Sequence, residues 1–485
     1  MRHRGSPGAA LGDSPTGAPL TADPEGEKPR QHMLDHVIDP PTPTPDRGLE
    51  REKTRWVMKQ MLIRRRGPAM NGMPERRRAP ELRRPAATRR TVSALATVLV
   101  FLTVPGPGAG QETQVTLGGQ VRPRMESRSQ GDIRNTFTSM RVRAQMEALL
   151  TRDVRVFIQV QDVRLFGEEA STLGDFRADG FDLHQGYLQW GFGQDVETEL
   201  RVGRQALVLG EQRLVGAVNW TQQGRSFDGA RLSTSPGDAL ELDVFAMKLQ
   251  EASSGTYGFD GEFLGAYGTT DLGTAGSLDL YALLVRDSRE EGTEEGTFGA
   301  LWKGRAGPVD LRLEGSLQRG DRRGQDVSAY MLGARAGVAV HEKATFTLWY
   351  DHLSGDDDPE AGEVGVFNTL FATNHAFYGY ADYFLNIPED TGGLGLRDLA
   401  VKLTLDPDPD TQLRVDLHAF STAEEGELST RRLANELDLT LTQRITPELS
   451  AMGGFSWVQA LDGMEELDRL EENANWAYLM LNVVF

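Results

Sequence analysis

The sequence contains no cysteine, and no run of about 20 apolar residues occurs in it. Without cysteine, the chain has no disulfide scaffold, no thiolate zinc site and no cysteine nucleophile. The lack of a long apolar run argues against a polytopic helical membrane protein, because each helical span needs such a run. Glycine, by contrast, is plentiful, at 54 of 485 residues. That surplus favours turns and β structure over helix bundles.

The charge is divided unevenly along the chain. Residues 1–110 carry 19 basic and 11 acidic residues, whereas the remainder carries 33 basic and 60 acidic ones. An acidic body argues against a nucleic-acid partner. Within the basic part, RRPAATRR (83–90) precedes an apolar stretch at 91–104, which is too short to span a membrane and is typical of a signal peptide.

We therefore predict three segments. Residues 70–110 are the signal peptide, residues 1–69 are a disordered or mis-assigned extension upstream of a true start at Met70 or Met73, and residues 111–485 are the mature domain. A tail-anchored or regulatory N-terminal segment is the alternative interpretation.

From Thr113 onward the dominant hydrophobic period is two. The strings MRVRAQMEA (140–148), VRVFIQV (154–160), VDLRLEGSL (309–317) and LAVKLTL (399–405) show it. A period of two places the apolar and the polar residues on opposite faces of a strand. A soluble sandwich buries such apolar faces against each other, whereas a membrane barrel turns them to lipid and the charged faces to a water-filled lumen.

Three features favour the membrane barrel. The leader directs the chain out of the cytoplasm. Nineteen segments qualify as strands, including a weak glycine-rich one near 259 and one near 376; bacterial barrels prefer even numbers. The chain ends in NWAYLMLNVVF, whose alternating apolar face closes on Phe485 and resembles the outer-membrane barrel assembly signal. We therefore predict an all-β fold, a single 18-stranded antiparallel transmembrane β-barrel with long extracellular loops.

The connections fit this fold. Short turns at 152–153 and 307–308 suit the periplasmic side, and polar stretches at 167–180, 288–297, 354–365 and 464–473 suit the outside. The aromatic stretch 365–383 has three interpretations. It stacks on sugars, packs a loop onto the barrel rim, or folds inward and narrows the pore.

Arginine is concentrated on the predicted lumen faces of the first third of the body. Guanidinium groups bind carboxylates bidentately, and a wall of several weak sites lets a polyanion move. Lumen acids such as Glu436 and Asp438 offer an alternative, in which arginine–acid pairs brace the wall. The predicted path comprises Arg122, Arg124, Arg141, Arg143, Arg155, Arg201, Arg204, Arg225, Arg231, Glu436 and Asp438.

Several strings resemble the alginate export porin family over roughly 113–485. They are GRQ (203–205), RLVG (213–216), NW (219–220), GRSFDG (224–229), TNHAFYGYAD (373–382) and NELD (435–438). The resemblance implies an 18-stranded, monomeric outer-membrane channel that passes an anionic polysaccharide. Many members of this family carry solutes other than alginate, so the solute does not follow from the resemblance.

We predict an outer-membrane porin that exports or passes an anionic polysaccharide such as alginate, or another anionic solute. A general or small-solute porin and a structural or adhesive barrel are the alternatives. An enzyme is disfavoured, because no G-x-S-x-G or H-E-x-x-H string occurs and His184 has the lipid-facing parity of its strand. We expect no cofactor and no metal site. The expected partners are outer-membrane lipid, lipopolysaccharide and the barrel assembly machinery, which reads Phe485.

Overall fold

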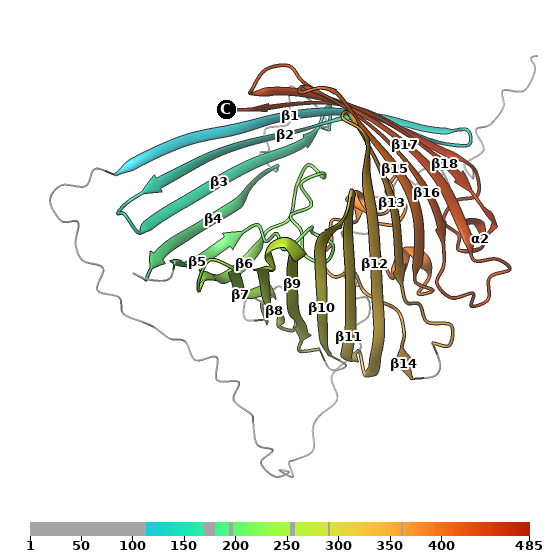
Figure 1. The fold of residues 1–485 in the computed structure, drawn as a ribbon, viewed down its shortest axis with the longest axis horizontal. Coiled ribbons are helices and arrows are strands. Elements are labelled where there is room, and N and C mark those ends of the chain that lie inside the picture. The colour runs from blue at the N-terminus through green and yellow to red at the C-terminus, as the bar shows by residue number, and fades with distance from the viewer. Residues whose placement is uncertain (1–112, 169–179, 194–196, 253–257, 290–291, 360–361) are drawn as a thin grey trace, which may run out of the picture. The chain divides into compact units, whose positions relative to one another are not determined.

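The alternating residues between Gln114 and Val484 form long antiparallel strands. The computed structural model describes residues 113–485, except for 169–179, 194–196, 253–257, 290–291 and 360–361. Barrel strands pair in chain order, and the first also pairs with the last, with Gln120 opposite Val484. Within this described part, the sheet closes into a barrel of 18 antiparallel strands (Figure 1).

The barrel strands range from 9 residues in β5 and β6 to 17 residues in β1, β2 and β12. They are β1 (Gln114–Gln130), β2 (Ile133–Leu149), β3 (Val154–Leu165), β4 (Phe181–Phe192), β5 (Glu197–Gln205), β6 (Phe227–Ser235), β7 (Leu240–Gln250), β8 (Gly261–Asp271), β9 (Ser277–Asp287), β10 (Thr293–Ala306), β11 (Val309–Arg322), β12 (Gln325–His341), β13 (Ala344–Leu353), β15 (Leu396–Asp408), β16 (Thr411–Ser421), β17 (Arg432–Arg444), β18 (Leu449–Ala460) and β19 (Ala474–Val484). The two-residue β14 (Glu363–Val364) is a parallel addition to β12 outside this series.

The predicted number of strands is confirmed, but the surplus candidate was misidentified. The glycine-rich stretch near 259 is β8, which pairs along its length with both β7 and β9. The candidate near 376 is a loop segment, in which Asn374–Ala376 form a short 3-10 turn. Its residues are apolar because they pack inside the barrel, and hydrophobicity alone does not distinguish such a segment from the wall. The predicted extension (1–69) and signal peptide (70–110) lie outside the described residues.

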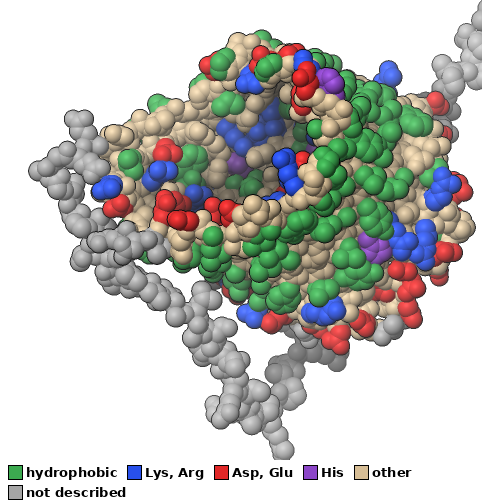
Figure 2. Space-filling view, viewed as in Figure 1, with side chains coloured by type: hydrophobic (Ala, Val, Ile, Leu, Met, Phe, Trp, Pro, Cys, Tyr) green, Lys and Arg blue, Asp and Glu red, His purple; other side chains and the backbone are tan. Residues whose placement is uncertain are grey.

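The two faces of the wall differ as the period of two predicts. Outward positions carry exposed aliphatic side chains such as Leu117, Leu280 and Leu479. Inward positions carry polar side chains such as Gln159 and Gln318, which are buried inside the barrel. Figure 2 shows a hollowed face with Lys and Arg side chains at depth, beside a broad band of hydrophobic side chains.

Short and long connections gather at opposite ends. The two-residue turn 307–308 and the turns after β2 and β12 lie at the same end as Gln114 and Val484. The longest connections, 206–226 and 354–395, lie at the other end. Short turns mark the periplasmic end of bacterial barrels, which assigns the long connections to the outside. The predicted loop 288–297 is shorter than expected because β10 already begins at Thr293, and 169–179 is outside the described residues.

Both long connections fold into the barrel. They contact each other through a bridge between Val215 and Phe371, and through bonds from the Gly216 amide to the Phe371 carbonyl and from the Thr373 amide to the Gln212 carbonyl, both 2.9 Å. A continuous apolar cluster joins them to inward side chains of the wall: Leu207, Leu214, Phe367 and Phe377 pack with Phe263, Met247, Met331 and Leu353. Of the three interpretations of the aromatic stretch, inward folding is therefore the one that the structure shows.

Helices are a minor part of the described chain. α2 (Asp462–Glu466) lies in the connection between β18 and β19. Among the described residues, no helix is long and apolar enough to cross a membrane.

Candidate functional site

Four of the predicted path arginines stand together on the inner wall of β1 and β2. Arg122 lies directly opposite Arg141 in the register of the two strands. Arg124 and Arg143 follow on the same face, and the exposed fractions of the four lie between 2% and 7%. Like charges directly opposite each other destabilise a strand pair, so this arrangement requires strong acceptors for the guanidinium groups.

Main-chain carbonyl oxygens of the connection 206–226 are those acceptors. Its residues 219–223, here called the tip segment, contact β1 and β2. Arg122 donates to the carbonyls of Asn219 at 2.7 Å and Thr221 at 2.8 Å. Hydrogen bonds with a charged donor contribute about 1.5–3 kcal/mol each, which outweighs a cross-strand repulsion of at most about 1 kcal/mol. Further carbonyl contacts join Arg124 to Trp220 (2.9 Å), Arg141 to Gln222 (3.3 Å) and Arg143 to Gln223 (3.2 Å).

Three of the four arginines have only neutral partners. Arg124 forms an ion pair with Glu126 at 2.8 Å. In the part of the chain that the structure describes, Arg122, Arg141 and Arg143 form no ion pair; amide oxygens complete their partners. These are Gln222 for Arg122 (3.0 Å), Gln120 for Arg141 (2.6 Å) and Gln161 for Arg143 (3.1 Å). The three charges are thus held but not neutralised.

A cavity of about 320 Å³ opens beside these same arginines. The lining includes the three arginines on β1 and β2, and Met452 and Met480 on the neighbouring strands β18 and β19. The remaining lining is uncharged and polar, from Gln120, Asn219, Ser450 and Asn482. The lining therefore combines three cationic side chains with two methionines and contains no carboxylate.

Three further path arginines lie on the inner face but have carboxylate partners. The ion pairs are Arg155 with Glu147 (3.2 Å), Arg201 with Glu199 (3.1 Å) and Arg231 with Asp243 (2.7 Å). Arg201 also lies opposite Arg231 in the register, so these pairs separate two like charges. The bracing role that the sequence left open fits these three residues.

Two predicted path residues are placed differently from the prediction. Arg204 lies on the outer face, because it is three residues from Arg201 and a strand of period two turns such positions to opposite sides. Its guanidinium pairs with Asp228 at 2.7 Å. Arg225 lies in the inward connection instead of a strand, and its side chain donates to the carbonyls of Phe371 and Ala372. It joins the two inward connections to each other.

Glu436 and Asp438 face inward on β17, as predicted, but the connection 354–395 covers them. Glu436 accepts a hydrogen bond from the Ala381 amide at 2.7 Å, and Asp438 accepts one from the Tyr380 amide at 3.3 Å. Gly379 has a φ of +81°, and a Cβ there would collide with the Glu436 carboxylate. The two acids therefore dock the aromatic connection onto the wall.

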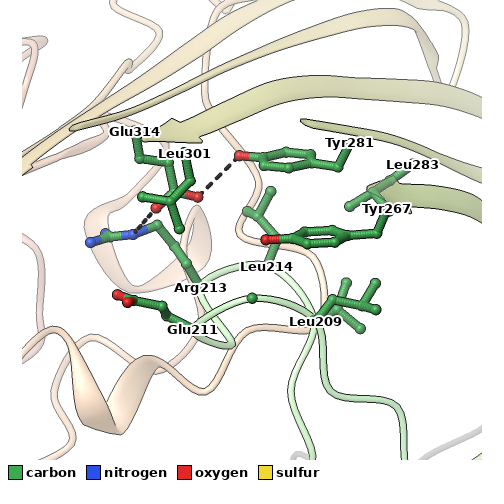
Figure 3. Close-up of a pocket in the computed structure, with 11 residues that line it drawn as sticks. Leu209, Glu211, Arg213, Leu214, Tyr267, Tyr281, Leu283, Leu301 and Glu314 are labelled. Carbon is green, nitrogen blue, oxygen red and sulfur yellow. Dashed lines mark hydrogen bonds and ion pairs between the residues drawn. The ribbon is translucent and has the colours of Figure 1, made fainter. Parts of the chain in front are cut away.

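Arg213 is the most connected charged residue that the sequence analysis missed. Its guanidinium lies 2.6 Å from Asp351 and 2.9 Å from Glu314, and it donates to the Tyr378 hydroxyl at 3.2 Å. Figure 3 shows it at the edge of a cavity of about 20 Å³ between the connection 206–226 and the wall. Burial lowers its pKa, but Asp351, Tyr378 and Glu314 outweigh burial and the net pKa is raised. The one available signal was an arginine directly before the apolar residues of RLVG (213–216).

His184 is buried inside the barrel, although its parity predicted the lipid face. A β-bulge between Gln159 and Val160 shifts the register of β3 and β4 there, and a bulge re-aims the following side chains. The His184 ring lies 3.2 Å from the Ser226 hydroxyl.

Phe485 lies at the closing seam of the barrel. Its carbonyl accepts from the Gly119 amide at 2.7 Å, and its amide donates to the Gly119 carbonyl at 3.1 Å. The residue is 68% exposed, so the ring is accessible from outside the chain.

Solved structures of outer-membrane proteins share this fold. OccK3 (OpdO) of Pseudomonas aeruginosa is 16% identical with a TM-score of 0.52, over 77% of this chain and 96% of that chain. OccAB4 of Acinetobacter baumannii is 12% identical with a TM-score of 0.52, over 78% and 99%. The outer membrane protein OprD of Pseudomonas aeruginosa is 15% identical with a TM-score of 0.51, over 76% and 93%. At such identities the likeness concerns the fold alone.

No curated protein sequence matches the chain. The alginate export family model matches residues 113–443, which include β1, β2 and both inward connections. The closed barrel, its polar lumen and this match agree with the resemblance in the sequence. The chain therefore belongs to the alginate export family and is an outer-membrane β-barrel channel.

Proposed function

We propose that the channel passes an anionic polysaccharide such as alginate, or another carboxylate-bearing solute, along the arginines of β1 and β2. The observation that carries this proposal is the group Arg122, Arg141 and Arg143, which border the 320 Å³ cavity and have neutral partners. A carboxylate is a stronger partner for a guanidinium group than a carbonyl or amide oxygen. A carboxylate that enters the cavity therefore binds these guanidinium groups more strongly than the carbonyl and amide oxygens that contact them in this structure.

The acidic body is compatible with an anion path. Figure 2 shows Lys and Arg side chains in the hollow and Asp and Glu side chains around its rim. Beside the cluster, Glu126 forms an ion pair with Arg124 at 2.8 Å. Several guanidinium groups along one face let a polyanion pass from site to site without being trapped at one of them.

A porin for compact anionic solutes is the second candidate. It is favoured by the two inward connections, which fill much of the lumen with the apolar cluster around Phe263 and Phe367. The cavity that remains beside the arginines is also lined by Met452 and Met480. A small carboxylate with an apolar face fits such a lining.

The family and the fold point to transport and away from catalysis. We further infer that the channel acts as a monomer and that the barrel assembly machinery reads the face ending at Phe485. The exposed ring of Phe485 beside the seam supports the second of these inferences.

Conductance in planar bilayers tests the proposal and separates its two forms. We expect an anion-selective channel whose current is blocked by an oligouronate and not by a neutral oligosaccharide of equal length. If small carboxylates carry current and the oligouronate has no effect, the compact-solute porin is correct. A cation-selective channel that ignores both would refute the anion path.

A further inference from the structure

Six charged residues of alternating sign form one continuous row across six neighbouring strands. Each is the register partner of the next, from β5 through β10, so no uncharged residue interrupts the row. The charged row, as we call it, consists of Arg204, Asp228, Lys248, Glu262, Arg286 and Glu294.

The charged row lies on the outer face of the barrel. Arg204 lies on the same face of β5 as Val202, which is 46% exposed. Gln205 lies on the opposite face and is buried inside the barrel. Asp228 likewise follows Phe227, which is buried inside the barrel. The side-chain exposed fractions in the row range from 24% at Glu262 to 63% at Glu294. These groups therefore meet the surroundings of the barrel, not the solute path.

Neighbouring residues of the row form three ion pairs. The distances are 2.7 Å for Arg204 to Asp228, 3.2 Å for Lys248 to Glu262 and 2.7 Å for Arg286 to Glu294. Exposed pairs of this kind contribute little to stability. Such groups can exchange one partner for another at small cost, which suits a surface that binds a layer of mixed charge.

The row marks the edge of the apolar band at the end of the long connections. Two residues along each strand toward the middle of the barrel, the outward side chains are apolar, as at Ala246, Leu264 and Leu284. Charged groups facing lipid are costly at the membrane centre and tolerated near its surface. Because barrel strands tilt, a row of register partners rises along the barrel and spans a range of heights.

We propose that the charged row binds the phosphorylated headgroup of an anionic glycolipid of the outer leaflet, lipopolysaccharide. Arg204, Lys248 and Arg286 bind its phosphates. Asp228, Glu262 and Glu294 bind the divalent cations that bridge those phosphates, because Mg²⁺ and Ca²⁺ take oxygen ligands. A layer built of phosphates and divalent cations needs both signs, which is the alternation that the row provides. This inference does not depend on the solute that the channel passes.

The test compares two variants that lose the same charge. R204Q/K248Q/R286Q removes the cations of the row, and R155Q/R201Q/R231Q removes three ion-paired arginines from the inner wall. Each protein is refolded in neutral detergent, and its unfolding midpoint is read from heat-modifiable gel migration. The midpoint is then measured with lipopolysaccharide micelles and Mg²⁺, and separately with phosphatidylglycerol vesicles.

We expect lipopolysaccharide to raise the unfolding midpoint of the wild type and of the inner-wall variant. The row variant should show at most half of that increase. R204K/K248R/R286K, which keeps the charges, should respond as the wild type does and controls for a folding defect. D228N/E262Q/E294Q should make the response independent of Mg²⁺. An undiminished increase in the row variant overturns the proposal. An equal increase from phosphatidylglycerol in the wild type overturns the choice of glycolipid.

Discussion

At the scale of single residues, charge neutralisation separates the arginines of the lumen into two kinds. Arg155, Arg201 and Arg231 each face a carboxylate. Arg122 and Arg141 lie opposite each other, and both donate to the carbonyl of Asn219 in the tip segment, 97 and 78 residues away in sequence. The second kind keeps its positive field in the cavity, which is the property that an anion path requires.

Arg213 is expected to hold the inward connections in place. Replacing it with methionine leaves Asp351 and Glu314 buried without their cation, and breaking a buried pair costs about 3–5 kcal/mol. We therefore expect R213M to keep a folded barrel but to show a larger or noisier single-channel conductance. The measurement is single-channel recording, with R204M on the outer face as the matched control. A conductance trace of R213M that matches the wild type would show that the connections are held without this pair.

Spacing along a strand predicted some of these residues and missed others. Arg122, Arg124, Arg141 and Arg143 were found because a spacing of two within one strand fixes a shared face. Arg204 was misplaced because it lies three residues from Arg201, and His184 because a bulge in its strand pair changes the parity. The carbonyl partners in 219–223 were beyond prediction, since nothing in a loop sequence shows where its backbone points.

At the scale of elements, wall strands and inward connections share a hydrophobic pattern but differ in pairing. β8 was the weakest candidate, because glycine lowers strand propensity, yet it pairs on both sides and completes the closed ring. The predicted strand near 376 is a loop segment, whose aromatic residues pack inside the barrel. Its polar partners are Glu436 and Asp438, which bind its backbone amides. Only the strand pairing around the closed barrel shows which apolar stretches belong to the wall.

Phe485 follows β19, and variants of it test recognition by the assembly machinery separately from closure of the barrel. Deleting Phe485 removes two main-chain hydrogen bonds to Gly119 as well as the ring, whereas F485A removes the ring alone. If the assembly machinery reads the aromatic side chain, both variants should reach the outer membrane in strongly reduced amounts. The measurement is the amount of heat-modifiable protein in outer-membrane fractions. Normal amounts of F485A with a defect only in the deletion would assign the effect to the seam.

At the scale of the whole molecule, the acidic sequence and the cationic cavity occupy different places. Much of the negative charge lies in connections and at the rim, while the cavity beside β1 and β2 is lined by three arginines and no carboxylate. The net charge of the chain therefore does not predict the charge of the residues that line this cavity. The fold followed from alternation, the strand number and the leader, whereas the filled lumen depends on contacts between distant connections.

The reversal potential of R141A/R143A tests the central claim most directly. The double variant removes two uncompensated charges from the cavity, and R204A removes an outer-face charge as the control. We expect the reversal potential of R141A/R143A to shift toward cation selectivity and its block by oligouronate to weaken, with R204A like the wild type. The shift should shrink between 0.1 M and 1 M salt, because the screening length falls from about 10 Å to about 3 Å. A double variant with wild-type selectivity and block at low salt would contradict the account, and the arginines of β1 and β2 would then serve only to hold the tip segment.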